Sequence, residues 1–164
     1  MLLPWLGLMI ICSVAGVRVT IRGMNTTEKL DFSALRSAVS ALERGVDVVE
    51  RKETSAEADE METLRFGVIQ CFEVAYEMCW KSIRRWIEIH LGKSEAEFLT
   101  RKELFRKAAE EGLLADPEPW FEFHRARNET SHTYNSETAR DVFSVALGFL
   151  PEALTLLATL EKRG

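Results

Sequence analysis

Apolar residues recur at steps of three and four along most of the chain, which is the spacing of one face of an α-helix. The first stripe runs from Phe32 to Val49, and Asp31 before it is a suitable N-cap. The second stripe begins at Met61 and widens until the helix is apolar over much of its circumference, up to a helix end near Gly92. A helix with so broad an apolar face is predicted to be central, with neighbours on more than one side.

Shorter helices are predicted in the second half of the chain. Thr100 and Glu103 have the spacing of a capping box and indicate the start of one. The run Asp116–Pro119 indicates the start of another, because proline is tolerated only in the first turn of a helix. Ser136 is the candidate N-cap of a final helix whose apolar stripe ends at Leu160. No convincing strand is found, so the sequence predicts an all-α, antiparallel up-down helical bundle of about five helices.

The first 23 residues differ from the rest, because residues 2–17 are almost wholly apolar. A transmembrane helix would need a longer run, of about 20 residues. A secretory signal would need a basic start, which is missing here. The third explanation, which we favour, is a start codon assigned too early, so that translation begins at Met24. We expect residues 24–164 to form one helical domain and residues 1–23 to be either a mis-assigned start or a signal-like extension.

Composition places the chain among folded globular proteins, with 46% hydrophobic and 29% charged residues. The net charge of −5 argues against a general nucleic-acid coat protein, but it allows a small basic site on an acidic body. The three cysteines, Cys12, Cys71 and Cys79, lack metal-ligand spacing. Cys71 and Cys79 lie among apolar residues of the second stripe, and we expect them to be buried free thiols in a reducing compartment.

Residues 127–135 carry no aliphatic side chain, although the segments on both sides are apolar. A solvated loop is one explanation, since loops are often rich in Asn, Ser and Thr. A phosphate-binding site is the other, built on Arg127 and His132. The spacing of these two residues is weak support, because Arg85 and His90 share it. On a continuous helix such a pair points about 140° apart, so Arg127 and His132 can meet only if a helix ends between them.

The residues between Arg127 and His132 favour such an ending, because Thr and Ser compete for backbone hydrogen bonds. The resulting pair could cleave RNA without a metal: His132 would transfer protons, and Arg127 would bind the phosphate. One histidine is too few for both proton transfers, and a symmetric dimer would supply the second. His90 and His124 are expected to be a helix-end histidine and a structural or surface histidine, respectively.

The motif Arg127-x4-His132-x-Tyr134 resembles the signature of HEPN-domain proteins encoded beside minimal nucleotidyltransferases, which are described as nucleotidyltransferase substrate-binding proteins. The likeness extends from about Leu30 to Leu160 and includes Phe72–Glu77 with Trp80 and Lys81, then Gly112–Leu114 with Asp116 and Trp120. The chain has no Gly-Ser pair followed by paired aspartates, so it cannot itself be the nucleotidyltransferase.

The resemblance implies a HEPN-like bundle that forms a homodimer, or a hetero-oligomer with its partner, in the cytoplasm and without a membrane. It implies an endoribonuclease toxin that uses no metal or cofactor and is neutralised when a nucleotidyltransferase antitoxin transfers AMP from ATP to a tyrosine. In that case Arg127 binds phosphate, His132 is the acid and base, Asn128 supports them and Tyr134 is the acceptor. A non-catalytic substrate-binding subunit and a purely structural dimer are the alternatives.

Overall fold

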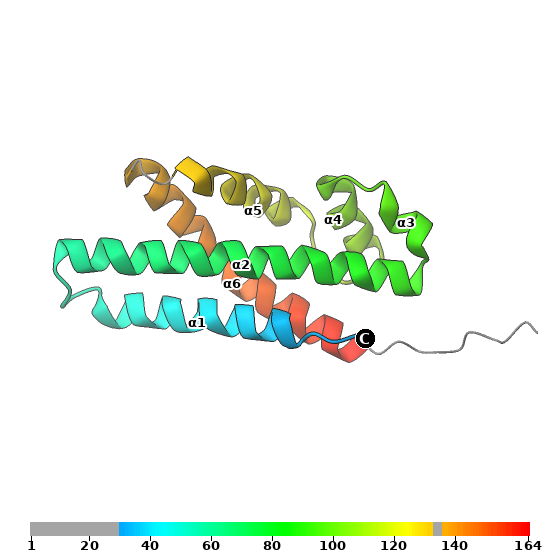
Figure 1. Ribbon diagram of the computed structural model, residues 1–164, viewed down its shortest axis with the longest axis horizontal. Coiled ribbons are helices and arrows are strands. Elements are labelled where there is room, and N and C mark those ends of the chain that lie inside the picture. Colours follow the sequence, from blue (N-terminus) through cyan, green and yellow to red (C-terminus); the bar gives the residue numbers. More distant parts are fainter. Residues whose placement is uncertain (1–29, 133–135) are drawn as a thin grey trace, which may run out of the picture.

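The helices of the protein are arranged around one long helix (Figure 1). The computed structural model describes residues 30–132 and 136–164, which contain no strand. Their elements are, in order, α1 (Ser33–Lys52), α2 (Ala58–His90), α3 (Lys93–Glu97), α4 (Arg101–Glu110), α5 (Glu118–Glu129), the 3-10 helix η1 (Thr130–His132) and α6 (Ser136–Arg163). The predicted all-α class is confirmed, and the short α3 is the helix that the sequence did not predict.

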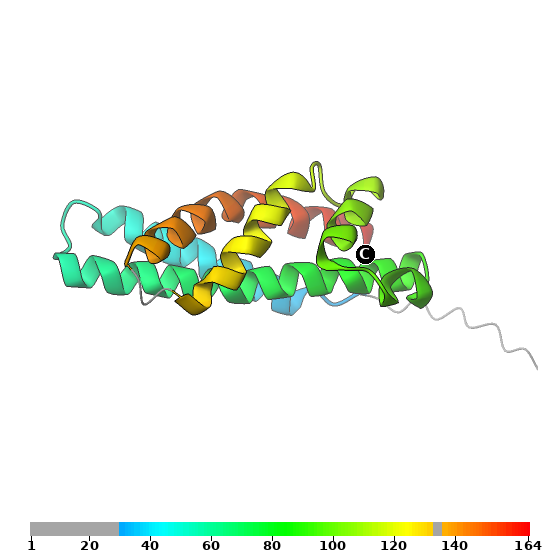
Figure 2. The same ribbon diagram turned by 90° about the horizontal axis from the view of Figure 1, so that it is seen from above.

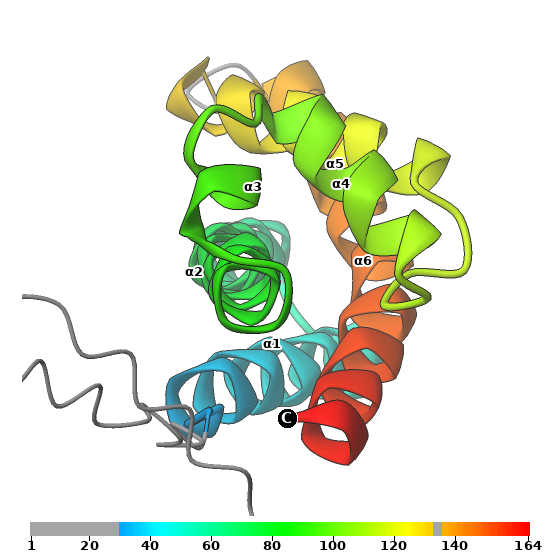
Figure 3. The ribbon, with the colours of Figure 1, turned by 90° about the vertical axis from the view of Figure 1, so that its right-hand side faces the viewer.

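Helix α2 is central, as its broad apolar stripe predicted. It packs against each of the other five α-helices of the described residues. In the view along α2, α1 lies below it, α3, α4 and α5 lie above it, and α6 passes on its right from α5 to α1 (Figure 3). Helices α1 and α2 form an antiparallel hairpin (Figure 1). The end of α5, where the polar stretch begins, is therefore supported by the flank of α2.

An aromatic cluster fixes α5 onto α2 and α6. The ring of Phe149 on α6 makes edge contacts with Phe72, Phe123 and Trp120, with ring centroids 5.1, 5.2 and 5.7 Å apart. Phe105 on α4 lies 5.4 Å from Trp120. Burial of each such side chain stabilises the fold by about 1.5–3 kcal/mol, so α5 has little freedom to shift relative to α2.

Most helix ends in the structure lie close to the capping residues that the sequence predicts. The Thr100–Glu103 capping box is present, and Gly92 follows α2 with φ of 106°, a conformation that favours glycine. Asp31 accepts a hydrogen bond from the Ser33 backbone N–H at 2.8 Å, although the N-cap position itself is Phe32. Ser136 was predicted to be the N-cap that precedes α6, but it is the first residue of the helix, so α6 begins one residue earlier than predicted.

Helix α6 is long and apolar enough to cross a membrane by length and composition alone. In this fold it packs along α1, α2 and α5, and Ala146, Phe149 and Leu160 are fully buried. One face of α6 is therefore part of the core of the bundle, while Leu147 and Leu154 of the same helix are exposed. The apolar segment 1–23 and its three explanations lie outside the described residues.

The two thiols of the described residues differ in their surroundings. Both Cys71 and Cys79 are free, as predicted. Cys79 is fully buried, and this burial raises the pKa of its thiol. Cys71 is half-buried, so the prediction that both are buried is correct only for Cys79.

Candidate functional site

The polar stretch begins where α5 ends. Arg127 lies in the last turn of α5, which stops at Glu129 and passes into η1. The Thr130 hydroxyl is 2.7 Å from the backbone oxygen of Arg127, and the Ser131 hydroxyl donates to the backbone oxygen of Asn128 at 3.2 Å. The Ser131 hydroxyl thus occupies a carbonyl that a continuing helix would use. The predicted helix ending between Arg127 and His132 is confirmed.

The other residues of the predicted motif are placed to different extents. Asn128 is exposed on α5. His132 is the last residue of η1, and its backbone alone is described. Tyr134 lies outside the described residues. The meeting of the Arg127, His132 and Tyr134 side chains therefore stays a prediction.

The Arg127 side chain crosses from α5 to the flank of α2. Its Nη2 is 3.7 Å from Oε1 of Glu77, and 35% of the side chain is exposed. The other oxygen of Glu77 accepts a hydrogen bond from Nε1 of Trp80 at 2.9 Å and is 3.4 Å from Nζ of Lys81. One carboxylate thus faces two cations. Arg127 pairs with Glu77 beyond hydrogen-bond distance and keeps its donors for an anionic ligand.

A groove of about 320 Å³ lies between Arg127 and α2. It is lined by Gln70, Glu73, Val74, Glu77, Met78, Lys81 and Arg127. The Glu73 carboxylate accepts a hydrogen bond from the Thr130 hydroxyl, which ties the start of η1 to the same wall. Sequence reasoning missed these groove residues. The available signal was a polar stripe at steps of three and four, from Gln70 to Lys81, on an otherwise apolar helix.

His124 lies one helical turn before Arg127 and has an interior partner. Its Nδ1 is 2.9 Å from the hydroxyl of the fully buried Tyr76, and the two rings are stacked. Burial, and then the nearby charges of Arg101 and Arg127, lower the pKa of His124. Burial also raises the pKa of the Tyr76 phenol. A neutral histidine hydrogen-bonded to a buried phenol fits the structural role predicted for His124.

The second Arg–His pair does not form a site, as predicted. The His90 ring stacks on Trp86 with centroids 4.1 Å apart, and its Nδ1 is 2.9 Å from the Trp86 backbone oxygen. Arg85 is 3.5 Å from Glu88. His90 is therefore a helix-end histidine.

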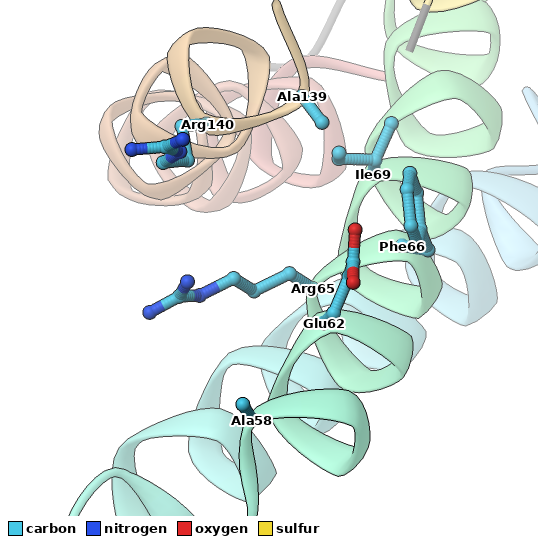
Figure 4. A pocket seen from close by; sticks show the side chains of 7 residues that line it. All are labelled: Ala58, Glu62, Arg65, Phe66, Ile69, Ala139 and Arg140. Atoms are coloured by element: carbon cyan, nitrogen blue, oxygen red, sulfur yellow. The ribbon is translucent and has the colours of Figure 1, made fainter. Parts of the chain in front are cut away.

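A second pocket, of about 230 Å³, lies between the first turns of α2 and the start of α6 (Figure 4). It is lined by Ala58, Glu62, Arg65, Phe66, Ile69, Ala139 and Arg140. Arg65 and Arg140 extend in the same direction in this view, and the Arg65 guanidinium is 5.7 Å from the Phe143 ring centroid. Sequence reasoning singled out neither arginine. Within the described ranges, no three His, Cys, Asp or Glu side chains are grouped so that they could hold a metal ion.

The described residues form an all-α protein in which Arg127 lies in the last turn of α5, beside a groove on α2. Residues 30–162 match the family model for nucleotidyltransferase substrate binding protein like proteins, and the chain belongs to this family. The family predicted from the sequence is thereby confirmed.

Comparisons with a named protein and with a solved structure, both from Haemophilus influenzae, support the assignment. The chain is 31% identical over 140 residues to a protein named probable ribonuclease HepT, covering 84% of this chain and 96% of the relative. It is similar to the solved structure of HI0074, described as revealing the fold of a substrate binding domain of a nucleotidyltransferase. That match has a TM-score of 0.74 and 29% identity, and it covers 80% of this chain and 99% of HI0074.

Proposed function

We propose that the protein is a metal-independent endoribonuclease toxin whose reaction uses Arg127 and His132. The observation that carries this proposal is the position of Arg127, which is anchored beside a groove where its helix stops. The relative named probable ribonuclease HepT supports the same class of reaction.

The proposed reaction transfers a phosphoryl group within the RNA. His132 takes the proton from a ribose 2′-hydroxyl, and the oxygen attacks the adjacent phosphorus. The bond to the 5′-oxygen of the next nucleotide breaks, and this oxygen receives a proton. The products are a 2′,3′-cyclic phosphate and a 5′-hydroxyl. Arg127 holds the non-bridging oxygens and stabilises the charge that develops on them, while Asn128 supplies a supporting polar group.

A homodimer would complete this chemistry, because one histidine accepts a proton and a second donates one. Val74 is 46% exposed and lies with the half-buried Met78 on the wall of the groove. Exposed apolar side chains next to a polar site are suited to a two-fold interface that places two copies of the site across one cleft.

Neutralisation would use a cognate nucleotidyltransferase, a partner class that the family description names. The Tyr134 phenol oxygen would attack the α-phosphorus of ATP, and pyrophosphate would leave. The attached AMP adds bulk and negative charge close to His132 in the chain, where it would oppose binding of an RNA phosphate. We propose that both proteins act in the cytoplasm and form a hetero-oligomer.

The reaction is tested by RNA cleavage with purified protein in the presence of EDTA. The Arg127→Ala variant should be slower than wild type by at least about 100-fold, because charge stabilisation in the transition state is lost. Arg125→Ala is the matched control, since Arg125 lies on the same helix and pairs with Glu122 and Glu129. Unchanged cleavage by Arg127→Ala, or complete loss of wild-type cleavage in EDTA, would contradict the proposal.

The modification is tested by mass spectrometry after incubation with the partner, ATP and magnesium. Wild type should gain the mass of AMP, and Tyr134→Phe should gain none. The chain has one other tyrosine, the fully buried Tyr76, which makes Tyr76→Phe the control. Modification of the Tyr134→Phe protein would rule out the acceptor role.

A non-catalytic substrate-binding subunit is the second candidate, favoured by the description of HI0074 as a nucleotidyltransferase substrate binding domain. It predicts complex formation with the nucleotidyltransferase and no RNA cleavage by any form of this protein. A purely structural dimer predicts that neither Arg127→Ala nor Tyr134→Phe has any effect.

A further inference from the structure

Beside the groove, cations of α4 lie over aromatic rings of α2 and α5. The Arg101 guanidinium carbon is 3.4 Å from the Trp80 ring centroid. Nζ of Lys102 and the guanidinium carbon of Arg106 are 5.5 and 5.3 Å from the Phe121 ring centroid. We call Trp80, Arg101, Lys102, Arg106 and Phe121 the basic–aromatic ridge. Figure 2 shows α5 crossing over α2, with α4 next to it toward the C-terminal end of α2.

The cations of the ridge are not held in ion pairs with carboxylates of the described residues, although the charge of Glu77 acts on Arg101 and the charge of Arg106 acts on Glu103. Within the described residues, no ion pair is formed by Arg101, Lys102 or Arg106. Glu103, their neighbour on α4, is bound to Thr100 in the capping box.

Other bases on the same helices are paired. Lys107 on α4 is 3.4 Å from Glu110 and 3.3 Å from Glu111. Arg125 on α5 pairs with Glu122 and Glu129. In a chain of net charge −5, the ridge is thus a local concentration of positive charge that forms no ion pair among the described residues.

The ridge adjoins the Arg127 site. Trp80 donates a hydrogen bond to the same Glu77 carboxylate that Arg127 approaches. Burial lowers the pKa of Arg101, while the charge of Glu77 raises it and the charge of Arg127 lowers it, so Arg101 and Arg127 lie near the same carboxylate. A polyanion bound at Arg127 could therefore continue onto the ridge without leaving the surface.

We propose that the basic–aromatic ridge binds the single-stranded RNA that flanks the phosphate held by Arg127. Free Lys and Arg side chains bind phosphates, and bases stack on aromatic rings and on guanidinium planes. An acidic protein would satisfy the charges but would not use the ring faces, so charge and stacking together favour RNA. This inference rests on the proposed ribonuclease function and names the path of its substrate.

The test compares two double variants that each remove two positive charges. Lys102→Ala/Arg106→Ala removes two free cations of the ridge, and Lys107→Ala/Arg125→Ala removes two paired ones. Both are made in a His132→Ala background, so that the RNA stays intact. Binding of a fluorescently labelled single-stranded RNA oligonucleotide of mixed sequence is measured by anisotropy at several salt concentrations.

We expect the ridge variant to bind about tenfold more weakly than its parent, and the control variant to bind within about twofold of it. The salt dependence, log K against log[salt], should become shallower by about 1.4 for the ridge variant, because two phosphate contacts are lost from a single strand. Phe121→Leu, which keeps the apolar bulk, should weaken binding severalfold through lost stacking.

Equal RNA affinity of the two double variants would contradict the proposed RNA-binding role of the ridge. Absence of RNA binding by the parent protein would contradict it as well. A ridge variant that binds RNA normally but no longer binds the nucleotidyltransferase would also overturn it and assign the surface to that protein. Cleavage by the wild-type protein is scored separately. If the ridge binds RNA but the wild-type protein does not cleave it, the proposed binding role is supported and the proposed ribonuclease function is contradicted.

Discussion

At the residue scale, the surroundings of Arg127 come from α2 and α4 more than from its own helix. The Glu77 carboxylate faces both Arg127 and Lys81, and Arg101 lies within electrostatic range. The positive charges exceed the negative ones at this point, which favours an anionic ligand and disfavours protonation of His124.

A pH dependence of stability follows from His124. Its pKa is lowered from 6.5 in the folded protein, so the unfolded chain binds a proton first as the pH falls. The stabilising contribution of neutral His124 is present above about pH 6.5 and is lost as the pH falls toward the folded pKa. Urea unfolding between pH 7.5 and pH 5, roughly the range in which histidine titrates, should show declining stability.

The control for this prediction is His124→Gln, which keeps a polar group near the Tyr76 hydroxyl but cannot titrate. Its free energy of unfolding should decline less over the same range. An equal decline in wild type and variant would assign the effect to other groups. Asp31 and Glu103, whose pKa values are also lowered, titrate in more acidic solution and do not enter this window.

At the element scale, the sequence was informative wherever the signal is local. The Thr100–Glu103 box, the glycine after α2 and the ending of α5 before His132 depend on neighbouring residues and were predicted. Helix α3 was not predicted, because five residues are too few to show a periodic stripe. The Glu77–Arg127 contact was not predicted either, since it depends on how α5 crosses α2.

Stability should depend on the capping box of α4. Thr100→Ala removes the side chain that accepts from the Glu103 backbone N–H, and we expect a loss of about 1 kcal/mol in the free energy of unfolding. Thr155→Ala serves as the control, because Thr155 is exposed in the interior of α6 and its hydroxyl bonds only to the Pro151 backbone oxygen. Similar stability losses for the two variants in urea denaturation would show that the capping box contributes nothing specific.

At the scale of the whole molecule, the five other α-helices of the described residues pack on α2 and bring together a groove and a ridge drawn from three separate helices. The all-α class and the family could be predicted from the sequence, because helical stripes and an ordered set of motifs extend over most of the chain. The ridge could not, because Trp80, Arg101 and Phe121 meet only when α2, α4 and α5 pack together.

The dimer proposed for catalysis can be tested at Val74, the exposed apolar residue on the wall of the groove. Val74→Arg should produce a monomer in analytical ultracentrifugation and lower RNA cleavage by at least about tenfold, because a buried unpaired charge opposes association. Phe98→Ser is the control, since Phe98 is 84% exposed at the end of α3, outside the residues that line the groove. A Val74→Arg protein that remains dimeric would place the interface elsewhere, and a monomer with full activity would show that one site suffices.

The central claim is that His132 performs proton transfer in RNA cleavage, and a comparison of the three histidines tests it most directly. Initial cleavage rates are measured for wild type, His132→Ala, His124→Gln and His90→Ala, each shown by circular dichroism to be folded. The account predicts that His132→Ala loses at least about 100-fold in rate while His90→Ala retains the wild-type rate. A folded His132→Ala protein that cleaves RNA as fast as wild type would contradict it.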